Sequence, residues 1–223
     1  YEIPKRDWSS DVCSSDLKDS IVVTAGNNLS DGVGDMLKAH SLNRLTVVPV
    51  RKPTWEEYVA YGTDAGFAPE LLTFVRQYPE VMASYKDSTQ KENTRIFNPK
   101  FPQRSYFSPR SGHRASNILL KRHLISRDAL IAALSGTIGE SSARDLLAFV
   151  EVADSLPTWE EILDAPAKAK VPTDAAALCI LAYSAVQKVD RGSINQWFEY
   201  LKDRKSTRLN SSHVSESRMP SSA

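Results

Sequence analysis

Three polar side chains, Asn27, Arg44 and Arg110, are of types and at positions that suit nucleotide hydrolysis. Asn27 comes directly after a predicted buried strand, and open α/β sheets bind ligands beyond the carboxyl ends of their strands. Arg44 stands between a predicted short helix and a second predicted strand. Arg110 lies in the first turn of a predicted helix, where its charge opposes the helix dipole, so a purely structural role is disfavoured.

Each of these residues also has a plainer interpretation, which the sequence alone leaves open. Asn27 could simply form an Asx turn at the end of a strand, and Asn28 is an adjacent rival for its role. Arg44 could be a cation near a helix C-terminus, which stabilises a helix by about 0.3–1 kcal/mol. Arg110 could be a surface arginine.

The first third of the chain alternates strand and helix patterns. Ser20–Thr24 and Leu45–Val48 are short, apolar and rich in β-branched residues, which is typical of strands buried on both faces. Asp35–Leu42 is predicted to be a short helix between them. Two apolar strands joined by a helical crossover predict a parallel βαβ unit, and therefore an α/β fold for this part.

The chain after Pro53 is predicted to be helical, apart from a polar, Pro-containing loop over Lys86–Ser108. Thr54, Ser108 and Ser126 are suitable N-caps, and Pro69 suits the first turn of a helix. Further helices are predicted over Gly139–Ser155, Asp174–Val189 and Ser193–Leu201. Their expected apolar faces contain Trp55, Tyr58, Val59, Leu71, Phe74, Val75, Leu130, Ile131, Leu134, Leu146, Leu147, Phe149 and Val150.

Three short motifs occur in the order that one family uses: Val22–Asn27, Leu42–Leu45 and Ser108–Ser111. Together with the later segments Pro157–Leu163 and Val171-Pro172, they resemble the C-terminal part of an AAA+ ATPase of the MoxR type. The resemblance covers nearly all of residues 18–202. It implies the last two strands of a P-loop parallel sheet in residues 18–51, followed by an α-helical lid and C-terminal helices in residues 52–202.

The resemblance also implies a role for each candidate residue. Asn27 would be the sensor 1 amide that positions the attacking water, and Arg110 would be the sensor 2 residue that contacts the γ-phosphate from the lid. Arg44 would be the arginine finger that reaches the ATP of a neighbouring subunit. The implied catalytic residues are therefore Asn27, Arg44 and Arg110, of which Asn27 and Arg110 contact the nucleotide, and none is a metal ligand.

ATP and Mg²⁺ are the implied cofactors, and both need residues that the sequence lacks. It contains no G-x-x-x-x-G-K-[ST] loop and no strand pattern ending in Asp-Glu, so we expect the chain by itself to be inactive. The implied assembly is a homo-oligomeric ring, with a hexamer expected, that remodels or matures a client protein in the cytoplasm. Two departures from the family pattern are the transposed Thr24-Ala25 and Leu45 in place of phenylalanine.

Two alternatives compete with this hypothesis. A nucleic-acid-associated AAA+ ATPase could use Asn93–Phe107, where basic and aromatic residues alternate. The near-neutral balance of 28 Lys and Arg against 27 Asp and Glu argues against such a partner. The other alternative is a helical interaction domain without nucleotide chemistry. No run of about 18 apolar residues indicates a membrane span, and Cys179 in its apolar run fits a reduced compartment.

Both ends of the chain match a translated sequencing adapter. Asp203–His213 agrees codon for codon with the common short-read adapter, and Arg6–Leu17 agrees with its opposite strand. The variable positions Ile3–Lys5 and Val214–Glu216 can be encoded by reverse-complementary barcodes. We therefore expect the natural protein to lie within Lys18–Lys202, and we exclude residues 1–17 and 203–223 from the fold argument.

Overall fold

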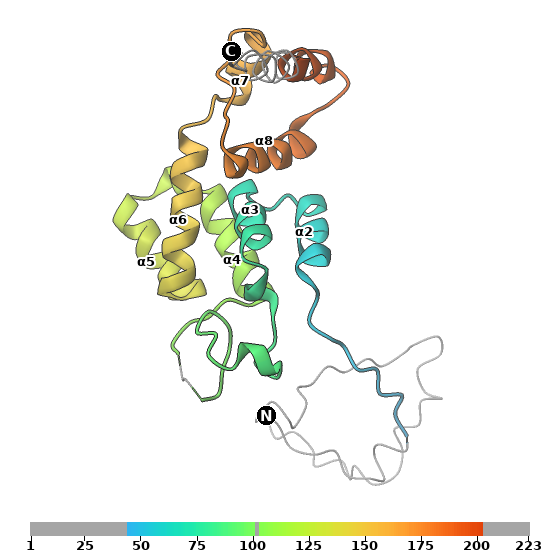
Figure 1. The fold of residues 1–223 in the computed structure, drawn as a ribbon, viewed down its shortest axis with the longest axis vertical. Helices are drawn as coiled ribbons and strands as arrows, with labels where there is room; N and C mark the ends of the chain where they lie inside the picture. The colour runs from blue at the N-terminus through green and yellow to red at the C-terminus, as the bar shows by residue number, and fades with distance from the viewer. Residues whose placement is uncertain (1–43, 101–102, 203–223) are drawn as a thin grey trace, which may run out of the picture. The chain divides into compact units, whose positions relative to one another are not determined.

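The computed structural model describes residues 44–100 and 103–202, which are mainly helical (Figure 1). The chain divides into two compact units, Tyr1–Val50 and Arg51–Ala223. The described helices belong to the second unit: α2 (Trp55–Asp64), α3 (Pro69–Gln77), η3 (Pro79–Met82), η4 (Ser88–Gln90), α4 (Pro109–Leu120), η5 (Arg122–Leu124), α5 (Arg127–Ile138), α6 (Glu140–Asp154), α7 (Trp159–Asp164) and α8 (Ala175–Lys188). Residues 194–202 are also helical.

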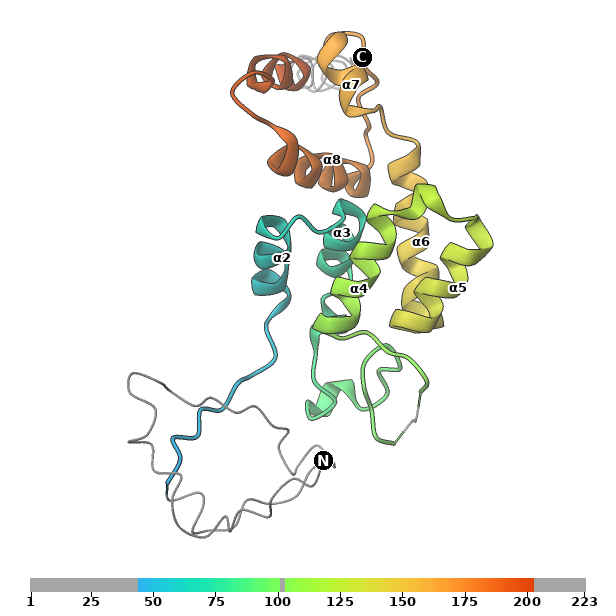
Figure 2. The ribbon, with the colours of Figure 1, turned by 180° about the vertical axis from the view of Figure 1, so that it is seen from behind.

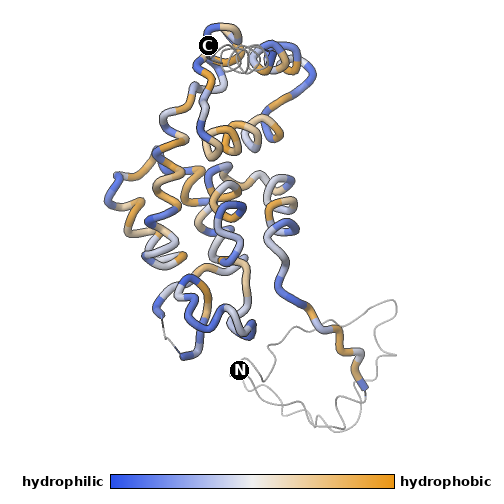
Figure 3. Tube along the Cα trace, in the orientation of Figure 1, coloured by the Kyte–Doolittle hydropathy of each residue, from blue (hydrophilic) through white to orange (hydrophobic). Residues whose placement is uncertain are grey.

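The predicted parallel sheet is wrong for the part of the chain that the structure describes. Residues 44–100 and 103–202 contain no strand, and the predicted strand Leu45–Val48 has no regular structure. This apolar stretch is exposed, with Val48 at 72% and Val50 at 90%, and it stands out as a hydrophobic segment before α2 (Figure 3). A strand needs hydrogen-bonded neighbours as well as an apolar sequence, so the pattern alone was insufficient. Ser20–Thr24 and Asp35–Leu42 lie outside the described residues.

The predicted helix starts are confirmed, and side-chain caps explain most of them. Thr54 and Ser108 each form a reciprocal capping box with the third residue of the helix that follows. Ser126 and Asp174 cap α5 and α8 through single side-chain hydrogen bonds. Pro69 opens α3, where its missing N–H costs nothing.

Helices α4, α5 and α6 follow one another in antiparallel order, and α3 packs against α2, α6 and α8 (Figures 1 and 2). The main core lies between them. Its centre is Phe74, whose ring lies 5.7 Å from that of Phe107 and 6.2 Å from that of Phe149. Most of the predicted apolar faces are buried here, but Ile131 is 37% exposed because only one side of α5 faces its neighbours.

A second, smaller cluster joins α7, α8 and residues 194–202. It contains the buried side chains of Ile162, Leu181 and Tyr200, and the Tyr200 hydroxyl donates a hydrogen bond to the Lys170 carbonyl at 3.1 Å. Helix α8 connects the two clusters, because Ile180 belongs to the main core while its neighbour Leu181 belongs to the smaller one.

Candidate functional site

Of the three predicted catalytic residues, Arg110 is the one that lies in the described helical unit. Asn27 lies outside the described residues. Arg44 is exposed in a turn of the unit Tyr1–Val50, whereas Arg110 belongs to the unit Arg51–Ala223, and each unit is described separately. The helical unit therefore provides a setting for Arg110 alone.

Arg110 occupies the first turn of α4, as the sequence predicted. The Ser108 hydroxyl accepts a hydrogen bond from the Ser111 N–H at 3.1 Å, and the Ser111 hydroxyl accepts one from the Ser108 N–H at 2.8 Å. Arg110 is exposed and makes no hydrogen bond or ion pair with any described residue. An unpaired cation at this end of a helix opposes the dipole, which an anionic ligand would relieve.

Close packing fixes the position of the α4 N-terminus. The Tyr58 hydroxyl of α2 donates a hydrogen bond to the Pro109 carbonyl at 3.1 Å, and burial raises the pKa of Tyr58. Gly112 faces the same ring, and a Cβ added there would lie only 2.5 Å from the Tyr58 hydroxyl and 2.9 Å from Phe107 Cζ. Glycine therefore allows α2 and α4 to begin side by side.

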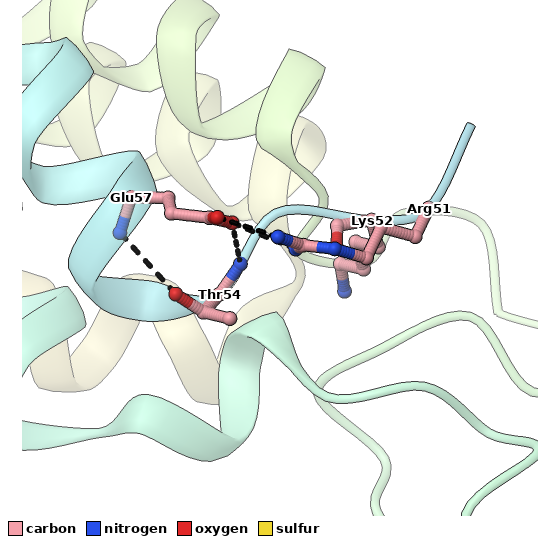
Figure 4. Close-up of polar contacts among 4 residues, drawn as sticks. All are labelled: Arg51, Lys52, Thr54 and Glu57. Atoms are coloured by element: carbon pink, nitrogen blue, oxygen red, sulfur yellow. Dashed lines mark hydrogen bonds and ion pairs between the residues drawn. The ribbon is translucent and has the colours of Figure 1, made fainter.

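Arg51, Thr54 and Glu57 organise the start of α2 (Figure 4). Glu57 accepts hydrogen bonds from the Thr54 N–H at 2.9 Å and from the Arg51 guanidinium at 2.7 and 2.5 Å. These hydrogen bonds, of which the one from Arg51 has the largest effect, lower the pKa of Glu57 to about 2. The start of this helix is therefore fixed by its own flanking residues.

Lys52 is a functional candidate that the sequence did not reveal. Its ammonium group donates hydrogen bonds to the Ala83 carbonyl at 2.9 Å and the Val81 carbonyl at 3.3 Å. Burial lowers the pKa of Lys52 to about 8, and the Asp87 carboxylate partly opposes this shift. The acceptors are some 30 residues away in sequence, so no local pattern could have predicted the contact.

Helices α2, α4 and α6 all begin at one end of the helical unit, whereas α3 and α5 run in the opposite direction (Figures 1 and 2). We call this the N-terminal end of the unit. Three positive helix-dipole ends lie at this end, and Lys52 and Arg110 add two cations. Glu56 and Glu57 in the first turn of α2 and Glu140 in that of α6 oppose them, whereas the first turn of α4 contains no acidic residue. The start of α4 therefore suits an anionic ligand best.

The segment that connects α3 to α4 is mainly hydrophilic (Figure 3), yet several of its rings pack together. Phe97 lies 5.5 Å from Tyr85 and 5.3 Å from Tyr106, measured between ring centroids, and Phe107 is buried in the core. Arg95 stacks on Tyr78 and pairs with Asp145 at 2.6 Å. These contacts occupy aromatic rings and a guanidinium group that a single-stranded nucleic acid would need for stacking and for phosphate contacts.

The described residues contain no group of three or more His, Cys, Asp or Glu that could hold a metal ion. Within the same ranges, no helix has both the length and the apolar character needed to cross a bilayer. At the end opposite to Arg110, Arg122 pairs with the buried Glu70 at 2.9 Å and with Asp154 at 2.8 Å. That triad links three chain segments and is best explained as structural.

The chain matches no protein-family model, no curated protein and no solved structure.

Proposed function

We propose that residues 52–202 form the α-helical lid and C-terminal helices of a MoxR-type AAA+ ATPase, in which Arg110 contacts the γ-phosphate of bound ATP. The observation that supports this most directly is the exposed, unpaired guanidinium of Arg110 at the capped N-terminus of α4. It stands at the end of the unit where three helix dipoles point outward.

In this proposal Asn27 positions the attacking water, and Arg44 reaches the ATP of a neighbouring subunit. The assembly would be a homo-oligomeric ring, with a hexamer expected, that remodels a client protein. The guanidinium of Arg110, which has no ion pair with any described residue, suits the negative charge of the ATP triphosphate. The described residues offer no acidic set for Mg²⁺, so the magnesium-binding acid and the phosphate loop would come from another part of a longer protein.

The proposal is tested by ATP turnover of that longer protein. We expect Arg110→Ala to lower kcat by on the order of 10²–10³, as for other lost transition-state donors. Arg44→Ala should lower it by roughly 10³–10⁵, as for an arginine finger. Arg114→Ala removes an exposed arginine one turn further along α4 and should leave kcat unchanged, which makes it the matched control.

If kcat is unchanged in both Arg44→Ala and Arg110→Ala, the chain is a helical interaction domain instead. A genomic sequence that lacks a phosphate loop and an Asp-Glu strand within one domain length upstream of Lys18 would also overturn the proposal. A nucleic-acid-dependent rise in turnover would favour the translocating class of AAA+ protein.

A further inference from the structure

A cavity of about 390 Å³ opens at the N-terminus of α6, formed by residues separate from Arg110. One wall is the start of α6, and the other is the segment that precedes α4. Its lining consists of Thr94, Arg95, Gln103, Arg104, Ser105, Ile138, Gly139, Glu140, Ser141 and Ser142. We call it the α6 cavity.

One side-chain donor in this lining lacks any partner among the described residues. Ser142 is only 1% exposed, and its hydroxyl has no hydrogen-bond partner in the structure. The Arg95 Nη1 atom makes no hydrogen bond, but it lies 3.7 Å from a Glu80 carboxylate oxygen and so already faces an anion. A buried hydroxyl without a partner is unfavourable, so Ser142 indicates a missing acceptor.

The backbone adds further donors to the same space. Gly139 precedes α6 with a φ of +86° and has no side chain to cap the helix. The N–H groups of Glu140, Ser141 and Ser142 have no acceptor among the described residues. These are the orphan donors of a helix of 15 residues, and their dipole end is positive.

The side-chain charges around the cavity are two guanidinium groups and three carboxylates. Arg95 is neutralised by Asp145 at 2.6 Å and lies 3.7 Å from Glu80, and Glu140 adds a negative charge at the rim. Arg104 is exposed and has no ion pair with any described residue. Arg104 and the helix dipole are therefore the positive features available to a ligand.

Gly139 also keeps the two walls together. A Cβ added at this residue would lie 3.0 Å from the Ser105 carbonyl oxygen, and its positive φ strains any other residue. The Ser105 hydroxyl donates a hydrogen bond to the Ser135 carbonyl at 2.8 Å, which fixes the wall to the end of α5. The donors are thus held in place before any ligand arrives.

We propose that the α6 cavity binds a phosphate-type oxyanion. The N–H groups at the start of α6 and the Ser142 hydroxyl donate to its oxygens, and Arg104 supplies the charge. This site does not depend on the ATPase proposal, because none of its lining residues is assigned a role in ATP hydrolysis.

The test is a titration of the 223-residue chain with inorganic phosphate, against chloride at equal ionic strength, followed by amide NMR. We expect saturable shifts at Glu140, Ser141 and Ser142. Arg104→Gln should weaken phosphate binding at least about tenfold, because hydrogen bonds to charged groups are among the stronger ones. Arg144→Gln, which removes an exposed arginine of α6 outside the cavity lining, should bind phosphate normally.

Ser142→Ala separates this proposal from a merely structural role. Removing an unsatisfied hydroxyl should not lower stability without phosphate, yet it should reduce the phosphate-dependent rise in melting temperature. The absence of saturable shifts, or equal shifts in wild type and Arg104→Gln, would show a cavity that holds water or an adventitious ion only. Binding of ATP without binding of inorganic phosphate would overturn the proposal as well.

Discussion

Lys52 shows how one partly buried charge affects the stability of the helical unit. Its ammonium group is satisfied by two carbonyl oxygens rather than by a carboxylate, so the hydrogen bonds are made but the charge stays largely uncompensated. Desolvation therefore dominates and lowers the pKa of Lys52 to about 8. The folded state releases this proton more readily than the unfolded chain does.

The stability of the protein should consequently depend on pH in a defined window. Between the folded pKa of about 8 and the ordinary lysine pKa of 10.5, the unfolded state binds more protons at Lys52. This group's contribution to the free energy of unfolding must then increase with pH. We expect urea unfolding from pH 8 to pH 10 to show wild type gaining stability relative to Lys52→Met.

Lys121→Met, which removes an exposed lysine, provides the control and should give a flat difference over the same range. A flat difference for Lys52→Met would mean that the ammonium group is as well solvated in the folded state as in the unfolded chain. The window ends near pH 10 because the unfolded chain itself starts to lose the Lys52 proton as the pH approaches 10.5.

Local sequence predicted some site residues and could not predict others. The place of Arg110 in a first helical turn was predictable because Ser108-Pro109 marks a helix start by interactions within four residues. Ser142 was missed as a ligand donor because its hydroxyl lacks a partner only once the chain is packed. The site roles of Asn27, Arg44 and Arg110 remain predictions.

At the scale of elements, two helical glycines have opposite surroundings. Gly112 of α4 faces Tyr58 and Phe107, so an added methyl group would collide with both rings. Gly136 of α5 has no atom within 4 Å of an added Cβ. Helix propensity alone favours alanine over glycine by roughly 0.5–1 kcal/mol at either position.

We therefore expect Gly136→Ala to raise the free energy of unfolding by about 0.5–1 kcal/mol. Gly112→Ala should lower it by about 1–3 kcal/mol, because overpacking outweighs propensity and breaks the Tyr58–Pro109 hydrogen bond. Chemical denaturation of the two variants measures both effects. Equal changes in the two would contradict the close contact at Gly112.

Helices were more predictable than strands for a physical reason. The caps at Thr54, Ser108, Ser126 and Asp174 act within three residues, so the sequence contains the whole interaction. A strand depends on partners elsewhere, and Leu45–Val48 lacks them in the described residues. The short α7 was not predicted as a helix, although Thr158 and Glu161 form a capping box there.

At the scale of the molecule, stability should come from the two apolar clusters. Their buried side chains run from Tyr58 to Tyr200. If residues 1–17 and 203–223 are adapter sequence, deleting both should change the melting temperature by less than about 2 °C, which for this size corresponds to under roughly 1 kcal/mol. Thermal unfolding of the shortened chain measures this.

The matched comparison is a deletion that also removes residues 194–202. It takes Tyr200 out of the smaller cluster and should lower the melting temperature clearly. A large loss from the first deletion alone would show that the terminal segments contribute to the fold, and the adapter hypothesis would then be wrong.

The indole rings of Trp159 and Trp197 lie 5.6 Å apart at an angle of 35°, and Trp197 packs against the smaller cluster. Transition dipoles at this separation couple, so the pair should give a near-ultraviolet circular dichroism signal that vanishes when the rings part. Trp55 packs against the main core instead, and its fluorescence reports on a different region. The two apolar clusters therefore have separate tryptophan signals. Recording circular dichroism and fluorescence during thermal unfolding would show whether the two clusters unfold at the same temperature.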